Sequence, residues 1–190
     1  TVEKGTVNEA LYLVEQTANE LSDGKQIMYS FYLPKSLVNV VITNDTTIGY
    51  GAFMNASEIR NITLPEMLVT IKDYAFDGCT NLLEISIPKP VAAIGEYAFN
   101  DNHKLASVIF EASQAQQHLL KVINNGTFRN CYVLNNLLIP YTVERIGVVA
   151  FENCNSLEDI VFDEETVEGA EIELEVIDEY AFYHCIALTN

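Results

Sequence analysis

The sequence predicts a repeat solenoid, a coil of short turns with a parallel β-sheet along one face. One phrase, of the form I-x-x-x-A-F or once I-x-x-x-T-F, returns in register, and its phenylalanines are Phe53, Phe76, Phe99, Phe128, Phe151 and Phe182. Their intervals are 23, 23, 29, 23 and 31 residues, which fit a base period of 23 with insertions of six and eight. Each Phe is followed six residues later by an apolar residue, which in five copies opens a phrase close to L-x-x-I-x-I.

This second phrase is typical of one strand per turn. Its positions one, four and six can line one side of a short strand, while positions three and five lie on the other face. A single turn buries too little apolar surface to be stable, so the core must be built by stacking. We expect a half copy at 37–47 and repeats that start at 48, 71, 94, 123, 146 and 177, with the last one truncated.

The phrases IGEYAF, YAFDGCTNLLEISIP and VAFENCNSLEDIVF are similar to BspA-type leucine-rich repeats, and the resemblance covers roughly residues 27–190. The segment YSFYLPKSLVNVVIT also resembles the linking phrase which that family places before its repeats. The resemblance implies a right-handed leucine-rich-repeat-like coil used for adhesion or protein recognition on bacterial and protozoan cell surfaces. It implies no catalysis. Ala56 and Asn102 depart from the pattern, since other copies have Cys there.

Residues 1–26 do not fit the repeat, and we predict that they form an N-terminal cap. Thr6 and Glu9 have the spacing of a capping box, and Gly24 offers a stop. An apolar stripe with helical spacing lies between them, made of Leu11, Val14, Ala18 and Leu21. We therefore expect a helix from Thr6 to Leu21 that covers the first turn, because a solenoid end exposes a cross-section of core.

The two insertions and the C-terminus interrupt the period. Residues 111–119 (EASQAQQHL) are polar, and residues 163–175 (DEETVEGAEIELE) are strongly acidic. Both are expected as loops on the edge that follows the strand. The strand phrase is missing after Leu188, so either more repeats follow in a parent protein or the last turn is frayed.

Composition excludes several classes of protein. With 49% hydrophobic residues the chain can form a core, which a disordered chain cannot. It holds 27 acidic against 10 basic residues, a net charge of −17, which disfavours nucleic acids and anionic membranes as partners. No apolar stretch approaches the length of a membrane span. We expect a monomer that is extracellular or at the cell surface, where its partner is a protein or a glycan.

Cysteines and histidines suggest no catalytic site. The cysteines each lie three residues after a repeat Phe, and they are Cys79, Cys131, Cys154 and Cys185. This register predicts reduced cysteines in the core, although a disulfide between Cys131 and Cys154 in adjacent turns stays open. The histidines occupy non-equivalent places in the repeat; they are His103, His118 and His184. We predict neither an enzyme nor a cofactor site, and only a pocket that gathers His118 with the acidic insertion would change this.

The acidic insertion is a weak candidate for calcium. Its carboxylates are hard oxygen ligands, but they lack the alternating arrangement of a calcium loop. The candidate ligands are Asp163, Glu164, Glu165 and Glu168. A solvated loop is the alternative.

The outer face of the sheet is the candidate binding surface. Position five of each strand gives a largely apolar column: Val41, Thr63, Ser86, Ile109, Leu138 and Val161. Position three gives a polar column: Asn39, Asn61, Glu84, Ser107, Asn136 and Asp159. An apolar column beside a polar one resembles the core and rim of an interface. The alternatives are that exposed strand positions simply favour β-branched residues, or that another domain covers them.

These observations predict a recognition module of a surface or secreted protein, with adhesion as its function. Two other functions stay open. The chain could be a structural spacer within a larger surface protein, or part of an enzyme whose catalytic domain lies elsewhere.

Overall fold

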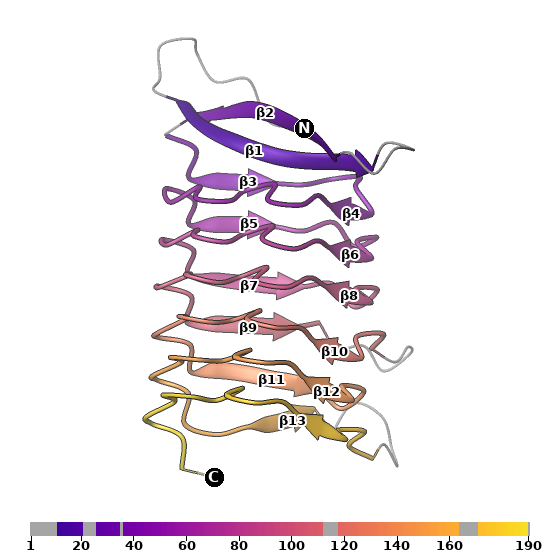
Figure 1. The fold of residues 1–190 in the computed structure, drawn as a ribbon, viewed down its shortest axis with the longest axis vertical. Helices are drawn as coiled ribbons and strands as arrows, with labels where there is room; N and C mark the ends of the chain where they lie inside the picture. The colour runs from indigo at the N-terminus through magenta and orange to yellow at the C-terminus, as the bar shows by residue number, and fades with distance from the viewer. Residues whose placement is uncertain (1–10, 21–25, 35, 112–117, 164–170, 190) are drawn as a thin grey trace.

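The computed structural model describes residues 11–20, 26–34, 36–111, 118–163 and 171–189. From Asn39 onward the chain forms a stack of turns that make a β-solenoid (Figure 1). One wall is a six-stranded parallel sheet in the order β13-β11-β9-β7-β5-β3. Its strands are β3 (Asn39–Val41), β5 (Asn61–Thr63), β7 (Glu84–Ile87), β9 (Ser107–Phe110), β11 (Asn136–Pro140) and β13 (Val161–Asp163). The predicted parallel sheet is confirmed.

A second set of two-residue strands forms two further parallel sheets of three strands each, in the orders β4-β6-β8 and β10-β12-β14. These strands are β4 (Thr47–Ile48), β6 (Thr70–Ile71), β8 (Ala93–Ile94), β10 (Val122–Ile123), β12 (Arg145–Ile146) and β14 (Val176–Ile177). Neighbouring strands pair at equivalent repeat positions, as Thr70 does with Ala93. Each turn therefore adds one rung to both walls.

The core is built from the positions that the strand phrase places inward. In the turn around β7 these are Leu82, Ile85 and Ile87, all buried. In the core, the repeat phenylalanines stack ring on ring from turn to turn, with centroids 5.2 to 5.5 Å apart. The four inner rings are fully buried. Such offset stacks of aromatic rings are favourable beyond the area they bury.

Each phenylalanine lies between two residues with left-handed backbone. Two residues before it stand Gly51, Tyr74, Tyr97, Gly126, Val149 and Tyr180. Two residues after it stand Asn55, Gly78, Asp101, Asn130, Asn153 and His184. All have φ between 50° and 71°. The second set suits this region, because Gly, Asn and Asp adopt it readily. The first set contains the β-branched Val149, for which this backbone is strained.

A ladder of side-chain donors links successive turns. Each repeat cysteine donates its thiol to the carbonyl of the phenylalanine one turn earlier, as Cys154 does to Phe128 at 3.2 Å. Asn102 takes the place of Cys in its copy, and its amide donates to the carbonyls of Phe76 at 3.1 Å and Phe99 at 2.9 Å. The departure from the repeat pattern therefore preserves the hydrogen bond between turns.

The predicted N-terminal helix from Thr6 to Leu21 is wrong. Within the described residues this part of the chain forms β1 (Leu11–Glu20), which pairs antiparallel with β2 (Gln26–Pro34). The β2 segment QIMYSFYLP is rich in aromatic residues, which favour strands. A single helix of this length gains little stability by itself, whereas the strand pair makes a continuous hydrogen-bonded ladder.

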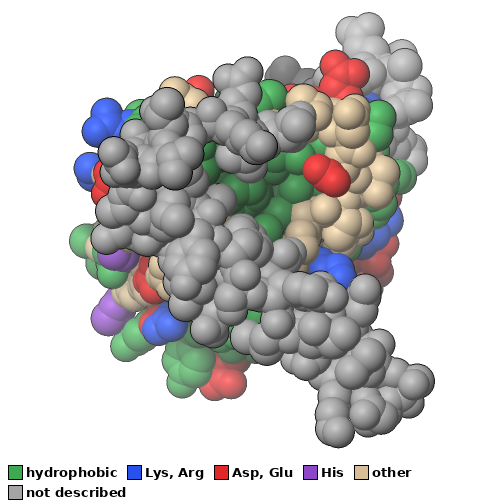
Figure 2. Space-filling view, turned by 90° about the horizontal axis from the view of Figure 1, so that it is seen from above, with side chains coloured by type: hydrophobic (Ala, Val, Ile, Leu, Met, Phe, Trp, Pro, Cys, Tyr) green, Lys and Arg blue, Asp and Glu red, His purple; other side chains and the backbone are tan. Residues whose placement is uncertain are grey.

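The two ends of the solenoid differ. The β1–β2 hairpin lies across the end next to β3 (Figure 1). Seen from that side, a group of hydrophobic side chains is visible near the middle of the molecule (Figure 2). At the other end, Ile177 is 53% exposed, although the equivalent Ile146 is fully buried by the turn that follows it. The side chains of the inner turns are thus buried by the adjacent turns.

We predict that Asn102→Ala lowers the free energy of unfolding by about 2 kcal/mol, because it removes two buried hydrogen bonds, to the carbonyls of Phe76 and Phe99. Asn102→Cys should lose less, since a thiol donates at this position in four other turns. Urea unfolding followed by circular dichroism measures both. Equal losses in the two variants would show that the donor is not what stabilises this position.

We predict that Val149→Asn raises the free energy of unfolding by about 1 kcal/mol, because Asn tolerates the left-handed backbone that strains Val149. The matched control is Val148→Asn, the same chemical change at the exposed neighbour. The control should leave stability nearly unchanged in the same unfolding measurement. A gain no larger in Val149→Asn than in the control would contradict the strain.

Candidate functional site

The apolar column occupies the outer face of the six-stranded sheet. Within it Val41, Ile109, Leu138 and Val161 are 42% to 56% exposed. Thr63 is also exposed, while Ser86 is half-buried. The pairing of Ser86 with Ile109 and of Leu138 with Val161 places these residues on adjacent rungs. The column is therefore a continuous surface of side chains without a covering layer in the described part of the chain.

The polar column runs beside it at the start of the strands. Asn39, Asn61, Glu84 and Asp159 are exposed, Ser107 is half-buried, and Asn136 begins β11. Asn61 donates its amide to Asn39 Oδ1 at 2.7 Å, which ties the first two rungs together. Asp159 precedes β13 and lies outside the ladder of the sheet.

A hollow of about 260 Å³ lies in this face across β5, β7 and β9. It is lined by Asn61, Ile62, Thr63, Leu64, Glu84, Ile85, Ser86, Ile109 and Glu111. Five of these residues belong to the two predicted columns. The structure therefore brings the middle of the predicted surface together in a concave site.

Glu111 is the exposed lining residue that lies outside the two columns; the other three, Ile62, Leu64 and Ile85, are buried. It follows β9 directly, and Ser86 donates its hydroxyl to Glu111 Oε1 at 2.7 Å. The equivalent place holds Pro65, Pro88 and Pro140 in three other turns, and Thr43 and Asp163 in the first and last strands. Because Asp163 is also acidic, the sequence alone does not single out Glu111.

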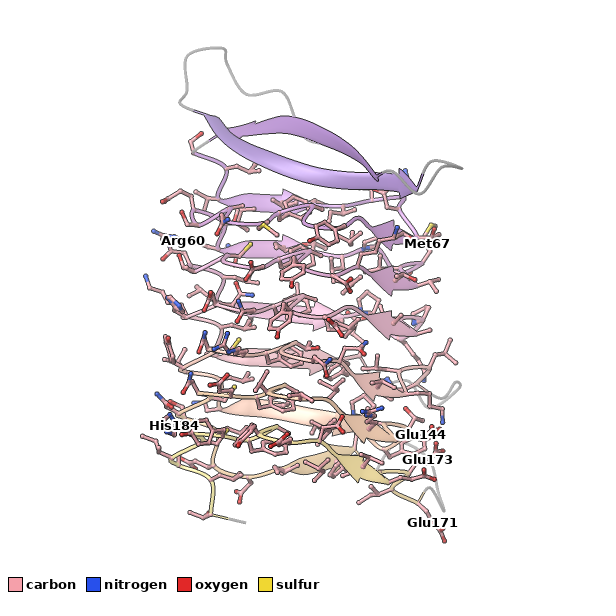
Figure 3. All side chains as sticks on the ribbon, viewed as in Figure 1. Arg60, Met67, Glu144, Glu171, Glu173 and His184 are labelled. Atoms are coloured by element: carbon pink, nitrogen blue, oxygen red, sulfur yellow. The ribbon has the colours of Figure 1, made fainter. Side chains whose placement is uncertain are left out.

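The ion pairs of the described residues lie away from the hollow. Lys121 pairs with Glu144 at 2.9 Å and with Glu173. Figure 3 shows Glu144, Glu171 and Glu173 at the edge that carries Met67, opposite the edge of Arg60 and His184. The hydrogen bonds that Lys121 donates to Glu173 and Glu144 raise its pKa.

All four cysteines are buried and free, as the repeat register predicts. Burial raises the pKa of Cys79 to about 12 and of Cys185 to about 11, and it raises those of Cys131 and Cys154. A thiol must ionise to act as a nucleophile or a metal ligand. At neutral pH these buried thiols are therefore protonated, and they pack in the core.

The three histidines have separate surroundings. His103 stacks on Tyr132 with ring centroids 4.9 Å apart, and His184 Nδ1 lies 3.2 Å from Asn153 Oδ1. His118 is buried, and its Nε2 lies 3.7 Å from Oδ2 of the equally buried Asp163. The structure thus brings His118 to the first residue of the acidic insertion, but neither residue lines the hollow.

The calcium candidates are only partly visible. Asp163 ends β13 and faces His118, and Glu164, Glu165 and Glu168 lie outside the described residues. Within the described ranges, no three His, Cys, Asp or Glu side chains gather where they could hold a metal ion. No helix there is long and apolar enough to cross a membrane.

Comparison with known proteins identifies the repeat. The family described as BspA type leucine rich repeat region, in six copies, matches residues 26–119 and 121–190. The search of curated proteins gave no match.

Solved bacterial structures share the fold. A leucine-rich repeat protein from Eubacterium ventriosum ATCC 27560 matches with a TM-score of 0.68 and 21% identity, over 85% of this chain and 43% of that one. The T. pallidum leucine rich repeat protein matches with a TM-score of 0.56 and 27% identity, over 67% of this chain and 60% of that one. This chain therefore spans less than two thirds of either protein.

The buried histidine makes stability depend on pH. Burial lowers the pKa of His118, and so does the charge of Lys89, while Asp163 opposes them. The unfolded chain consequently binds a proton more readily than the folded one, so this histidine costs stability as the pH falls below its unfolded value of about 6.5. His118→Gln cannot titrate. Between about pH 7 and pH 5 we expect the wild type to lose stability relative to this variant in urea unfolding. A constant difference across that range would contradict the prediction.

Proposed function

This chain belongs to the BspA-type leucine-rich repeat family, and from that premise we propose that it is a non-catalytic recognition module of a cell-surface or secreted protein. The module binds a protein or glycan through the outer face of its six-stranded sheet and serves adhesion. Its surface location is what membership of this family implies.

One observation carries the proposal: the exposed apolar column runs the length of the sheet beside a polar column. Four of its six residues are large aliphatic side chains, namely Val41, Ile109, Leu138 and Val161, and all four are exposed. Three of them, Ile109, Leu138 and Val161, lie on consecutive rungs, and such a patch of exposed aliphatic side chains is typical of an interaction site. A polar rim beside them is the arrangement of a protein interface.

The chemistry of the titratable groups supports a role without catalysis. Nucleophilic catalysis needs an ionisable nucleophile beside a base that a third group orients. The four thiols are buried with raised pKa values. His118 and Asp163 are buried against each other, away from the hollow.

The alternative is a spacer that holds another domain away from the surface. The unbroken stack of phenylalanine rings favours it, because a continuous core resists bending between turns. A spacer needs no ligand on the sheet face. Binding measurements therefore separate the two functions.

We expect saturable binding of this chain to at least one member of a panel of extracellular-matrix proteins and glycans, measured by surface plasmon resonance. The variant Ile109→Ser, Leu138→Ser, Val161→Ser should bind at least about tenfold more weakly, because three aliphatic side chains that the partner would bury are lost.

The matched control changes three exposed aliphatic residues outside the column: Met67→Ser, Leu83→Ser, Val148→Ser. It should bind as the wild type does, and circular dichroism should show that both variants are folded. Equal loss of binding in the two variants would remove the sheet face as the site. A wild type that binds nothing on the panel would favour the spacer.

A further inference from the structure

The hollow in the sheet face exists because two rungs carry small side chains. The apolar column has Thr63 and Ser86 on β5 and β7, where other rungs have valine, leucine or isoleucine. Ile109 on β9 stands next to Ser86 in the register and forms an apolar wall. At about 260 Å³ the hollow is smaller than the ~300–1,000 Å³ of sites for drug-sized molecules. It has the size for one side chain of a partner.

Two carboxylates border this hollow. Glu84 begins β7, and Ser86 follows two residues later on the same face, about 7 Å along the strand. The Ser86 hydroxyl donates to Glu111 and so holds that carboxylate beside the same depression. Both acidic residues are exposed, and within the described part of the chain neither pairs with a lysine or an arginine. The lining itself contains no basic residue.

We propose that the hollow binds a basic side chain of a protein partner, with arginine as the best fit. The proposal rests on the sheet face being the recognition surface and names its partner as a protein with an exposed basic residue. The methylene stem would pack on Ile109, and the guanidinium would donate to the carboxylates of Glu84 and Glu111. The net charge of −17 draws such a partner toward the chain.

The lining favours a protein over a glycan. A sugar ring packs well on an aromatic side chain, and the hollow has none. Two of its five polar side chains are carboxylates, Glu84 and Glu111, and a cation with several donors satisfies two carboxylates better than neutral hydroxyls do. The partner side chain therefore supplies donors, a positive charge and an apolar stem.

The test uses two peptides with acetylated and amidated ends, Gly-Ala-Arg-Ala-Gly and the same peptide with citrulline in place of arginine. Citrulline keeps the shape and lacks the charge. In two-dimensional NMR of the labelled chain, the arginine peptide should shift the amide signals of Ser86 and Ile109, with a dissociation constant on the order of 1 mM. The citrulline peptide should bind at least about tenfold more weakly.

The variant Glu84→Gln, Glu111→Gln should weaken the arginine peptide at least about tenfold. The control Glu158→Gln, Glu179→Gln removes the same charge from exposed residues outside the hollow and should keep wild-type binding. The proposal is overturned if the peptides bind equally, if no signal near the hollow shifts, or if the control loses as much as the hollow variant.

The same variants separate this proposal from the recognition function. A panel ligand that needs Ile109, Leu138 and Val161 but binds the Glu84→Gln, Glu111→Gln variant normally would keep the function and overturn the arginine site. Arginine binding in the hollow without any panel ligand would keep the site and count against adhesion to the panel.

Discussion

The stack of phenylalanine rings is the constraint on which the rest of the solenoid depends. Rings stack 5.2 to 5.5 Å apart within the coil while strands pair along its walls, so every turn must advance by nearly the same rise. The two long intervals leave this spacing intact: Phe99 and Phe128 are 29 residues apart in sequence, yet their centroids are 5.5 Å apart. Extra residues can therefore enter only where they leave both walls undisturbed, and both insertions follow a strand of the long sheet.

In the irregular part of each turn, backbone N–H groups donate hydrogen bonds to carbonyl groups of the next turn. The amide of Phe76 donates to the carbonyl of Ala98, and that of Phe128 donates to Ala150, both at 2.8 Å. Left-handed residues on either side of the ring make this possible, because they turn the backbone so that its groups point along the stack. The thiol or amide three residues after the ring then donates a hydrogen bond to the carbonyl of the phenylalanine one turn earlier. This explains why Asn can replace Cys in an inner turn, whereas Ala56, at the equivalent place of the first turn, has no side-chain donor.

The sequence predicts the solenoid because its signal is repeated, and it fails where the signal occurs once. Six registered copies predict the parallel sheet, the buried strand positions and the free cysteines, since each rests on the same spacing. The segment at Leu11–Glu20 has no second copy, and its apolar stripe fits a helix as well as one strand of a hairpin. This segment is a strand because it pairs with Gln26–Pro34. A pattern within Leu11–Glu20 alone cannot predict a partner elsewhere in the chain. The hollow escapes prediction for a related reason, because it depends on Glu111 being held by a serine 25 residues earlier.

The six repeats also show at which positions the fold does not restrict the residue type. Strand positions one, four and six and the ring position keep their apolar character in every turn, because each must fill the same space against its neighbours. Positions three and five face outward, and they range from Asn and Ser to Glu, and from Ser and Thr to Ile and Leu. Packing does not demand this variation, since one polar and one β-branched residue would serve each rung equally well. Small residues adjoin an aliphatic wall and two carboxylates at one place only among the described rungs, around β7. The backbone of this face repeats regularly from rung to rung, but its outward side chains vary. This variation is therefore the strongest argument for the proposal that the sheet face binds a partner.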